Sequence, residues 1–124
     1  MLLIIKPDGL KKQIMSRTIE TRSGSEFFTN INSEQLLGEL CKELGCKYYL
    51  TPSWIRGIPK LAFSMNAMEA QEAADKIRET LESPEIWIKK YSHYFEKGAG
   101  AEDWIESMEY YIECFEKSEG YECI

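Results

Sequence analysis

The feature that most constrains the fold is a series of three amphipathic helix patterns in the second half of the chain. Asn66 and Glu69 have the spacing of a capping box, Ser83 and Pro84 have the N-cap and N1 character of a second helix, and a third covers residues 101–117. In each pattern the apolar residues recur every three or four positions, at Ala67, Ala70, Ala74, Ile77 and Leu81, at Trp87, Ile88, Tyr91, Tyr94 and Phe95, and at Trp104, Ile105, Met108, Tyr111, Ile112 and Phe115. These stripes predict helices that pack together through their apolar faces.

The first half of the chain indicates strands around one helix. A hairpin is predicted from residues 2–5 and 12–21, with turn chemistry at Pro7-Asp8-Gly9, and residues 26–29 indicate a third strand. A helix is predicted to begin at Asn32, with Gln35 completing a capping box, and to end at Gly45. Residues 47–50 and 58–65 predict two further strands. We therefore predict an α+β fold, a small antiparallel sheet from N-terminal hairpins packed on C-terminal helices, in a single domain spanning residues 1–124.

The charge of the chain bears on its partners and its location. The net charge is −6, divided into +3 for residues 1–60 and −9 for residues 61–124, and this acidic balance disfavours nonspecific binding to a nucleic acid duplex. No stretch reaches the roughly 18 apolar residues of a membrane-spanning helix. The opening residues lack the pattern of a secretory signal, so a cytoplasmic location without membrane contact is predicted.

The cysteines and the single histidine offer little for metal or catalytic chemistry. Cys41 and Cys46 are separated by four residues and His93 is remote from them in sequence, which is not the close pairing of ligands at a zinc site. Free thiols, no metal and no cofactor are therefore expected. The sequence contains no nucleophile elbow and no phosphate-binding glycine loop, and we predict that the protein is not an enzyme and has no catalytic residues.

The segment from Ile4 to Leu10 resembles the opening strand and loop of nucleoside diphosphate kinases. That family carries its phosphoryl group on a histidine within an Asn-His-Gly-Ser stretch. This sequence has no such stretch, and His93 stands between Ser92 and Tyr94 instead. We therefore interpret Lys6-Pro7-Asp8-Gly9 as a hairpin turn without phosphoryl-transfer activity.

The strongest candidate for ligand binding is a loop bounded by Pro52 and Pro59. It carries Trp54 as a flat face for a base and Arg56 and Lys60 as donors for phosphate oxygens, with stiff ends that reduce the entropy lost on binding. The alternative is that Trp54 fills the core while Arg56 faces solvent. Arg17, Arg22 and Phe27 form a second candidate surface, for which the alternative is an edge strand that uses its charges against aggregation.

In size, strand-first layout and composition rich in Ile, Lys, Glu and Tyr, the whole chain resembles small phage proteins that disarm bacterial immunity, in particular the Thoeris anti-defence protein 1 family. The resemblance lies in layout and composition, so no site residue is transferred. It implies a homo-oligomeric sponge in the host cytoplasm that captures a cyclic ADP-ribose-like nucleotide signal without cleaving it and so blocks a host immune effector. The alanine seam from Ala67 to Leu81 and the aromatic helix faces independently favour a homo-oligomer.

Two other functions stay open. An acidic protein inhibitor could use the −9 charge of residues 61–124 to mimic nucleic acid and bind a basic host protein. A nucleotide-transforming enzyme is the third possibility, and it would show turnover where a sponge would release its nucleotide intact.

Overall fold

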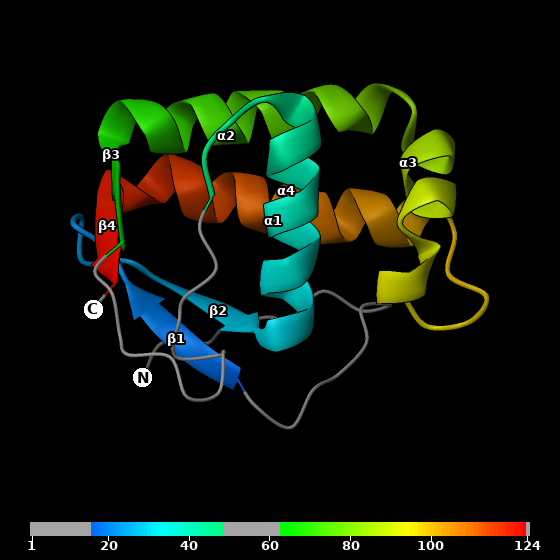
Figure 1. The fold of residues 1–124 in the computed structure, drawn as a ribbon, viewed down its shortest axis with the longest axis horizontal. Coiled ribbons are helices and arrows are strands. Elements are labelled where there is room, and N and C mark those ends of the chain that lie inside the picture. The colour runs from blue at the N-terminus through cyan, green and yellow to red at the C-terminus, as the bar shows by residue number, and fades with distance from the viewer. Residues whose placement is uncertain (1–15, 49–62, 124) are drawn as a thin grey trace.

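The computed structural model describes residues 16–48 and 63–123, and helices dominate these residues. Figure 1 shows helices α2 (Ala67–Glu79) and α4 (Ala101–Ser118) running antiparallel along the long axis, with α1 (Ile31–Leu44) crossing them. The short helix α3 (Pro84–Lys90) lies at one end, between the 3₁₀ turns η2 (Thr80–Glu82) and η3 (Ser92–Tyr94). Within the described residues, no helix has both the length and the apolar character that crossing a bilayer requires.

The described strands form two separate antiparallel pairs. Strand β1 (Ser16–Glu20) pairs with β2 (Glu26–Asn30), and β3 (Phe63–Asn66) pairs with β4 (Gly120–Cys123). In the second pair Phe63 lies opposite Cys123 and Asn66 lies opposite Gly120, so the start of α2 and the end of α4 are joined by strands. The turn between β1 and β2 is tied to this end, because the Arg22 amide donates to the Gly120 carbonyl over 2.8 Å.

The predicted α+β architecture, a small antiparallel sheet of N-terminal hairpins packed on C-terminal helices, is therefore wrong, and the protein is mainly helical. Among the side chains that the structure describes, every buried hydrophobic residue except Met65 comes from a helix or from the turns that join the helices. A pair of strands buries too little by itself to replace such a core. The β-branched residues near Ile19 do favour a strand, but β1 belongs to an isolated pair.

Two asparagines near the start of helix α1, Asn30 and Asn32, are both suitable N-cap residues. The helix begins after Asn30 instead of Asn32: the Asn30 side chain accepts from the Ser33 amide at 2.8 Å, and the Ser33 hydroxyl accepts from the Asn30 amide. Asn32 is buried and donates through Nδ2 to the Tyr94 carbonyl at 3.0 Å. The predicted end is confirmed, since Gly45 adopts a left-handed conformation with φ 80°.

The middle of the predicted alanine seam is buried inside the chain, whereas Ala67 is exposed and Leu81 is half-buried. Ala70, Ala73, Ala74 and Ile77 are buried on α2, which packs chiefly against α4, and small side chains permit this close approach. The capping box predicted at Asn66 and Glu69 is confirmed, with the Glu69 amide donating to Asn66 at 2.8 Å. The seam therefore contributes to the core of one chain, and it does not support the predicted homo-oligomer.

Candidate ligand-binding site

The residues of the predicted loop site fall where the structure gives no description. Trp54, Arg56 and Lys60 all belong to residues 49–62 and lie outside the described residues. Their role as ligand-binding residues stays a prediction.

The second predicted surface is partly described. Arg17 on β1 pairs with Thr29, and Phe27 on β2 pairs with Ile19, so the structure places Arg17 and Phe27 on the same hairpin. Arg22 is exposed and lies just beyond the end of β1, beside the carboxyl end of α4. The backbone thus brings the three predicted residues onto one strand pair and its turn.

The described residues contain a different feature, an aromatic cluster made by Trp87, Tyr91, Tyr94, Phe95 and Trp104. Trp104 lies at its centre: its ring centroid is 6.2 Å from that of Trp87, 5.9 Å from that of Tyr91 and 5.9 Å from that of Phe95. Its side chain has no exposed surface, and its indole Nε1 donates to the Thr80 hydroxyl at 3.0 Å. The apolar area and the satisfied indole together fix this end of α4.

Carboxylates of α1 hold the outer rim of the aromatic cluster. The Tyr91 hydroxyl donates to Glu43 Oε1 at 2.6 Å, Lys90 also donates to Glu43, and the Tyr94 hydroxyl donates to Glu39. The bonds from Lys90 and Tyr91 lower the pKa of Glu43, because both stabilise its charged form. Burial, and then the Glu43 carboxylate, raises the pKa of the Tyr91 hydroxyl. This rim is therefore a charged contact between α1 and α3.

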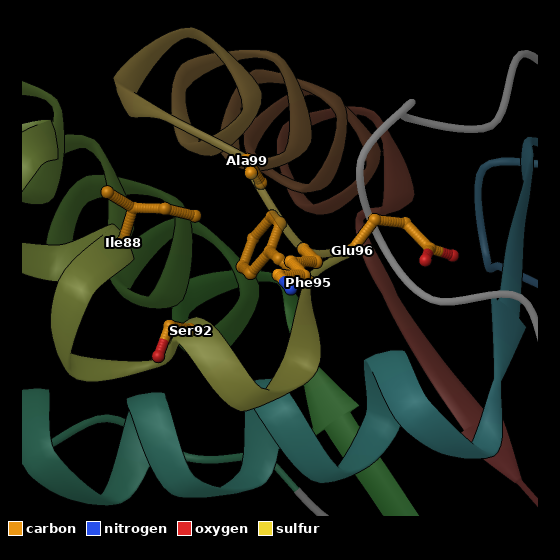
Figure 2. A pocket seen from close by; sticks show the side chains of 7 residues that line it. Ile88, Ser92, Phe95, Glu96 and Ala99 are labelled. Atoms are coloured by element: carbon orange, nitrogen blue, oxygen red, sulfur yellow. The ribbon is translucent and has the colours of Figure 1, made fainter.

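Beside the aromatic cluster lies a cavity of about 530 Å³. It is lined by Ile88, Ser92, Phe95, Glu96, Lys97, Gly98 and Ala99, where the chain passes from α3 through η3 towards α4. Figure 2 shows Phe95 in the middle of the labelled side chains, with Ile88 and Ser92 to one side and the Glu96 side chain extending away from them. The volume falls in the range of small-molecule sites.

The cavity combines an aromatic ring, a hydroxyl group, a cation and the carboxylate of Glu96. Phe95 contributes the ring, Ser92 the hydroxyl and Lys97 an exposed ammonium group. At the nearby amino end of α4, the N-cap amide of Gly100 donates to the Asp103 carboxylate at 2.7 Å.

The sequence patterns do not indicate this cavity. They predict one continuous helix from Trp87 to Phe95, whereas α3 ends at Lys90 and the chain turns through η3 before Phe95. The run Gly98-Ala99-Gly100 was the available signal, because it leaves backbone without bulky side chains next to an aromatic segment. The predicted Pro84 at the first position of the helix is confirmed.

His93 and the cysteines do not combine into a metal centre among the described residues. His93 is exposed, with its Nε2 atom 3.9 Å from Glu39 Oε2 and its ring 4.2 Å from the ring of Tyr94. The described part of the chain contains no group of three or more His, Cys, Asp or Glu side chains placed to hold a metal ion.

Comparison with known proteins finds no matching family model, no similar curated protein and no similar solved structure.

Proposed function

We propose that this protein binds a small nucleotide signal of the cyclic ADP-ribose class and sequesters it without cleavage. The observation that carries the proposal is the cavity beside the aromatic cluster, because it offers nucleotide-sized space next to a ring, a hydroxyl and a cation. A base can contact the small part of Phe95 that faces the cavity, while a phosphate oxygen can accept from Lys97. In a phage-infected cell, such a protein would keep the signal from a host immune effector.

The rigid surroundings of the cavity support a binding role. Phe95 is 2% exposed and its ring centroid lies 5.9 Å from that of Trp104, which is held by its bond to Thr80. The Tyr94 carbonyl accepts from buried Asn32, so η3 is also fixed to α1. A lining held in place before the ligand arrives loses less entropy on binding.

A thermal-shift titration with cyclic ADP-ribose tests the proposal. A ligand at one hundred times its dissociation constant adds about 2.7 kcal/mol to stability, which raises the unfolding temperature measurably. Heating the complex should then release the nucleotide unchanged in mass and retention time. No stabilisation across a panel of cyclic nucleotides contradicts the proposal, and a cleaved product indicates an enzyme instead.

Two variants locate the site. If the cavity binds the phosphate, Lys97→Gln should weaken binding about ten- to a hundredfold. The matched control is Lys89→Gln, because Lys89 is exposed on α3 and does not line the cavity. If the proline-bounded loop binds it, Arg56→Ala should cause that loss while Lys97→Gln leaves the affinity unchanged.

A second function is favoured by the outer face of α4. This face carries a row of exposed glutamates at Glu102, Glu106, Glu109, Glu113 and Glu116, of which the last two also form ion pairs with Lys117 and Arg78. Regularly spaced negative charges of this kind suit a basic partner, as in an inhibitor that mimics nucleic acid. Binding to a basic DNA-binding protein that is lost at high salt and competed by duplex DNA, without any nucleotide binding, favours this function.

The proposal includes assembly into a homo-oligomer. The described surface exposes few large hydrophobic side chains, of which Met68 on α2 is 81% and Ile86 on α3 is 66% exposed. Sedimentation at micromolar concentration tests assembly directly. A species of monomer mass alone would remove the oligomer from the proposal without affecting nucleotide binding.

A further inference from the structure

The carboxyl end of α1 holds two cysteines in one tight turn. The Cys46 amide donates to the Cys41 carbonyl at 2.9 Å, and Gly45 between them has φ 80°. This is the hydrogen bond of a Schellman turn, which brings the residues at its two ends close together and is often accompanied by contact between their side chains. A disulfide needs the same closeness between its two residues.

The two thiols differ in exposure. Cys41 has no exposed surface and Cys46 is half-buried, and their thiols lie within hydrogen-bonding reach of each other. We propose that Cys41 and Cys46 form a reversible dithiol–disulfide site that exchanges with small-molecule disulfides such as oxidised glutathione. Cys46 is the attacking residue because solvent reaches it, and Cys41 is the resolving residue because it adjoins the sulfur of Cys46.

The electrostatic surroundings of the two thiols agree with the attacking role of Cys46 and the resolving role of Cys41. The hydrogen bond from Cys41 is the largest influence that lowers the pKa of Cys46, and Lys76 on α2 adds to it, whereas burial and Glu72 oppose it. The same hydrogen bond, together with burial, raises the pKa of Cys41. Cys114 on α4 differs from Cys46, since burial raises its pKa to about 12.

The reaction proceeds in two exchanges. The Cys46 thiolate attacks one sulfur of the small disulfide, forms a mixed disulfide and releases one thiolate. Cys41 then loses its proton and attacks the Cys46 sulfur, which releases the second thiolate. Two protein thiols are oxidised by two electrons, the small disulfide is reduced to two thiols, and the protons of the protein thiols end on the released molecules.

The sequence offers a direct readout, because Lys42 lies between the two cysteines. We expect the full-length protein, treated with oxidised glutathione, alkylated and digested with trypsin without reduction, to yield residues 23–42 linked to residues 43–47. Reduction should separate the two peptides. A lasting mixed disulfide of glutathione on Cys46, or two free cysteines, overturns the proposal.

Variants test the order of attack. Cys41→Ser should accumulate the mixed disulfide on Cys46, and Cys46→Ser should leave Cys41 unmodified. Reaction of Cys41 in the second variant contradicts the assigned roles. With a limiting alkylating reagent, Cys46 should be labelled at least about tenfold faster than Cys114 in the same wild-type sample, and equal rates also contradict them.

Discussion

The two ends of helix α4 are packed differently, although Phe115 also contributes a buried ring near the second end. Near its beginning, Trp104 is surrounded by the large rings of the aromatic cluster, and the cavity lies directly beside them. Towards its end, α4 lies against the alanines of α2 and continues into β4, which pairs with β3. The order of contacts follows the antiparallel helices, since Trp104 bonds Thr80 and Glu116 lies 3.5 Å from Gln71.

This difference shows where a small helical protein has room for a ligand. Large rings pack by edges and offset faces and leave irregular space at their margin, whereas small side chains let backbones approach closely. The aromatic end can therefore provide both rigidity and volume. The alanine end provides close backbone contact.

Truncating the centre of the aromatic end should have the largest effect. Trp104→Ala removes a fully buried ring and leaves Thr80 without its donor, so we expect a loss of about 3–5 kcal/mol in the free energy of unfolding, measured by urea denaturation. Trp87→Ala is the matched control, because Trp87 is half-buried, and its loss should be clearly smaller. Equal losses would contradict the central role of Trp104.

Gly120 and Gly98 lie near opposite ends of α4 and allow the packing of the two ends to be compared directly. A Cβ atom at Gly120 would lie 2.3 Å from the Met65 carbonyl oxygen, and Gly120 also has φ 96°. Gly98, beside the cavity, has φ 90° but no atom within 4 Å of such a Cβ.

Replacing each glycine by alanine should therefore distinguish the cost of a left-handed backbone, which both positions have, from the cost of a steric clash, which only Gly120 has. Gly98→Ala should cost about 1 kcal/mol, from the left-handed backbone alone, and Gly120→Ala about 2–4 kcal/mol in the same urea assay. A cost at Gly98 as large as that at Gly120 would remove the distinction between open and closely packed ends.

The smallest effect concerns the charged rim of the aromatic end. The folded protein lowers the pKa of Glu43, so its contribution is present above the unfolded pKa of about 4.3 and is lost as the pH falls through the folded value. Because Glu43 is partly exposed, Glu43→Gln should cost only about 0.5–1 kcal/mol at pH 7. In urea denaturation at a series of pH values this difference should shrink below about pH 4.3, while Glu85→Gln on the exposed side of α3 should show no such difference.

The features that the sequence predicts correctly are those determined by residues close together in the chain. The end of α1 at Gly45, the cap of α2 and the extent of α4 are confirmed, because each follows from a cap or from a regular apolar stripe. The start of α1 is two residues earlier than predicted. Asn30 and Asn32 are equally good caps locally, and the bond from Asn32 to Tyr94 decides between them.

Features that depend on distant residues could not be predicted in this way. Nothing near Gly120 indicates that Met65 lies opposite Tyr121, so the sequence patterns do not predict strand β4. The cavity also depends on distant packing, because it forms only where η3 redirects the chain beside Trp104. The prediction of a single sheet is wrong for the same reason. Strand propensity indicates which residues favour a strand, but it does not specify how many other strands each one pairs with.

The β3–β4 pair joins positions separated by roughly 60 residues, with Phe63 opposite Cys123. Closing a chain segment of this length is entropically more expensive than forming a helix, although the added cost rises only with the logarithm of the length. The antiparallel packing of α2 and α4 places the ends that carry the two strands next to each other. Folding should then proceed from the helices to the strands, so that the pair forms last and opens first when the native protein fluctuates.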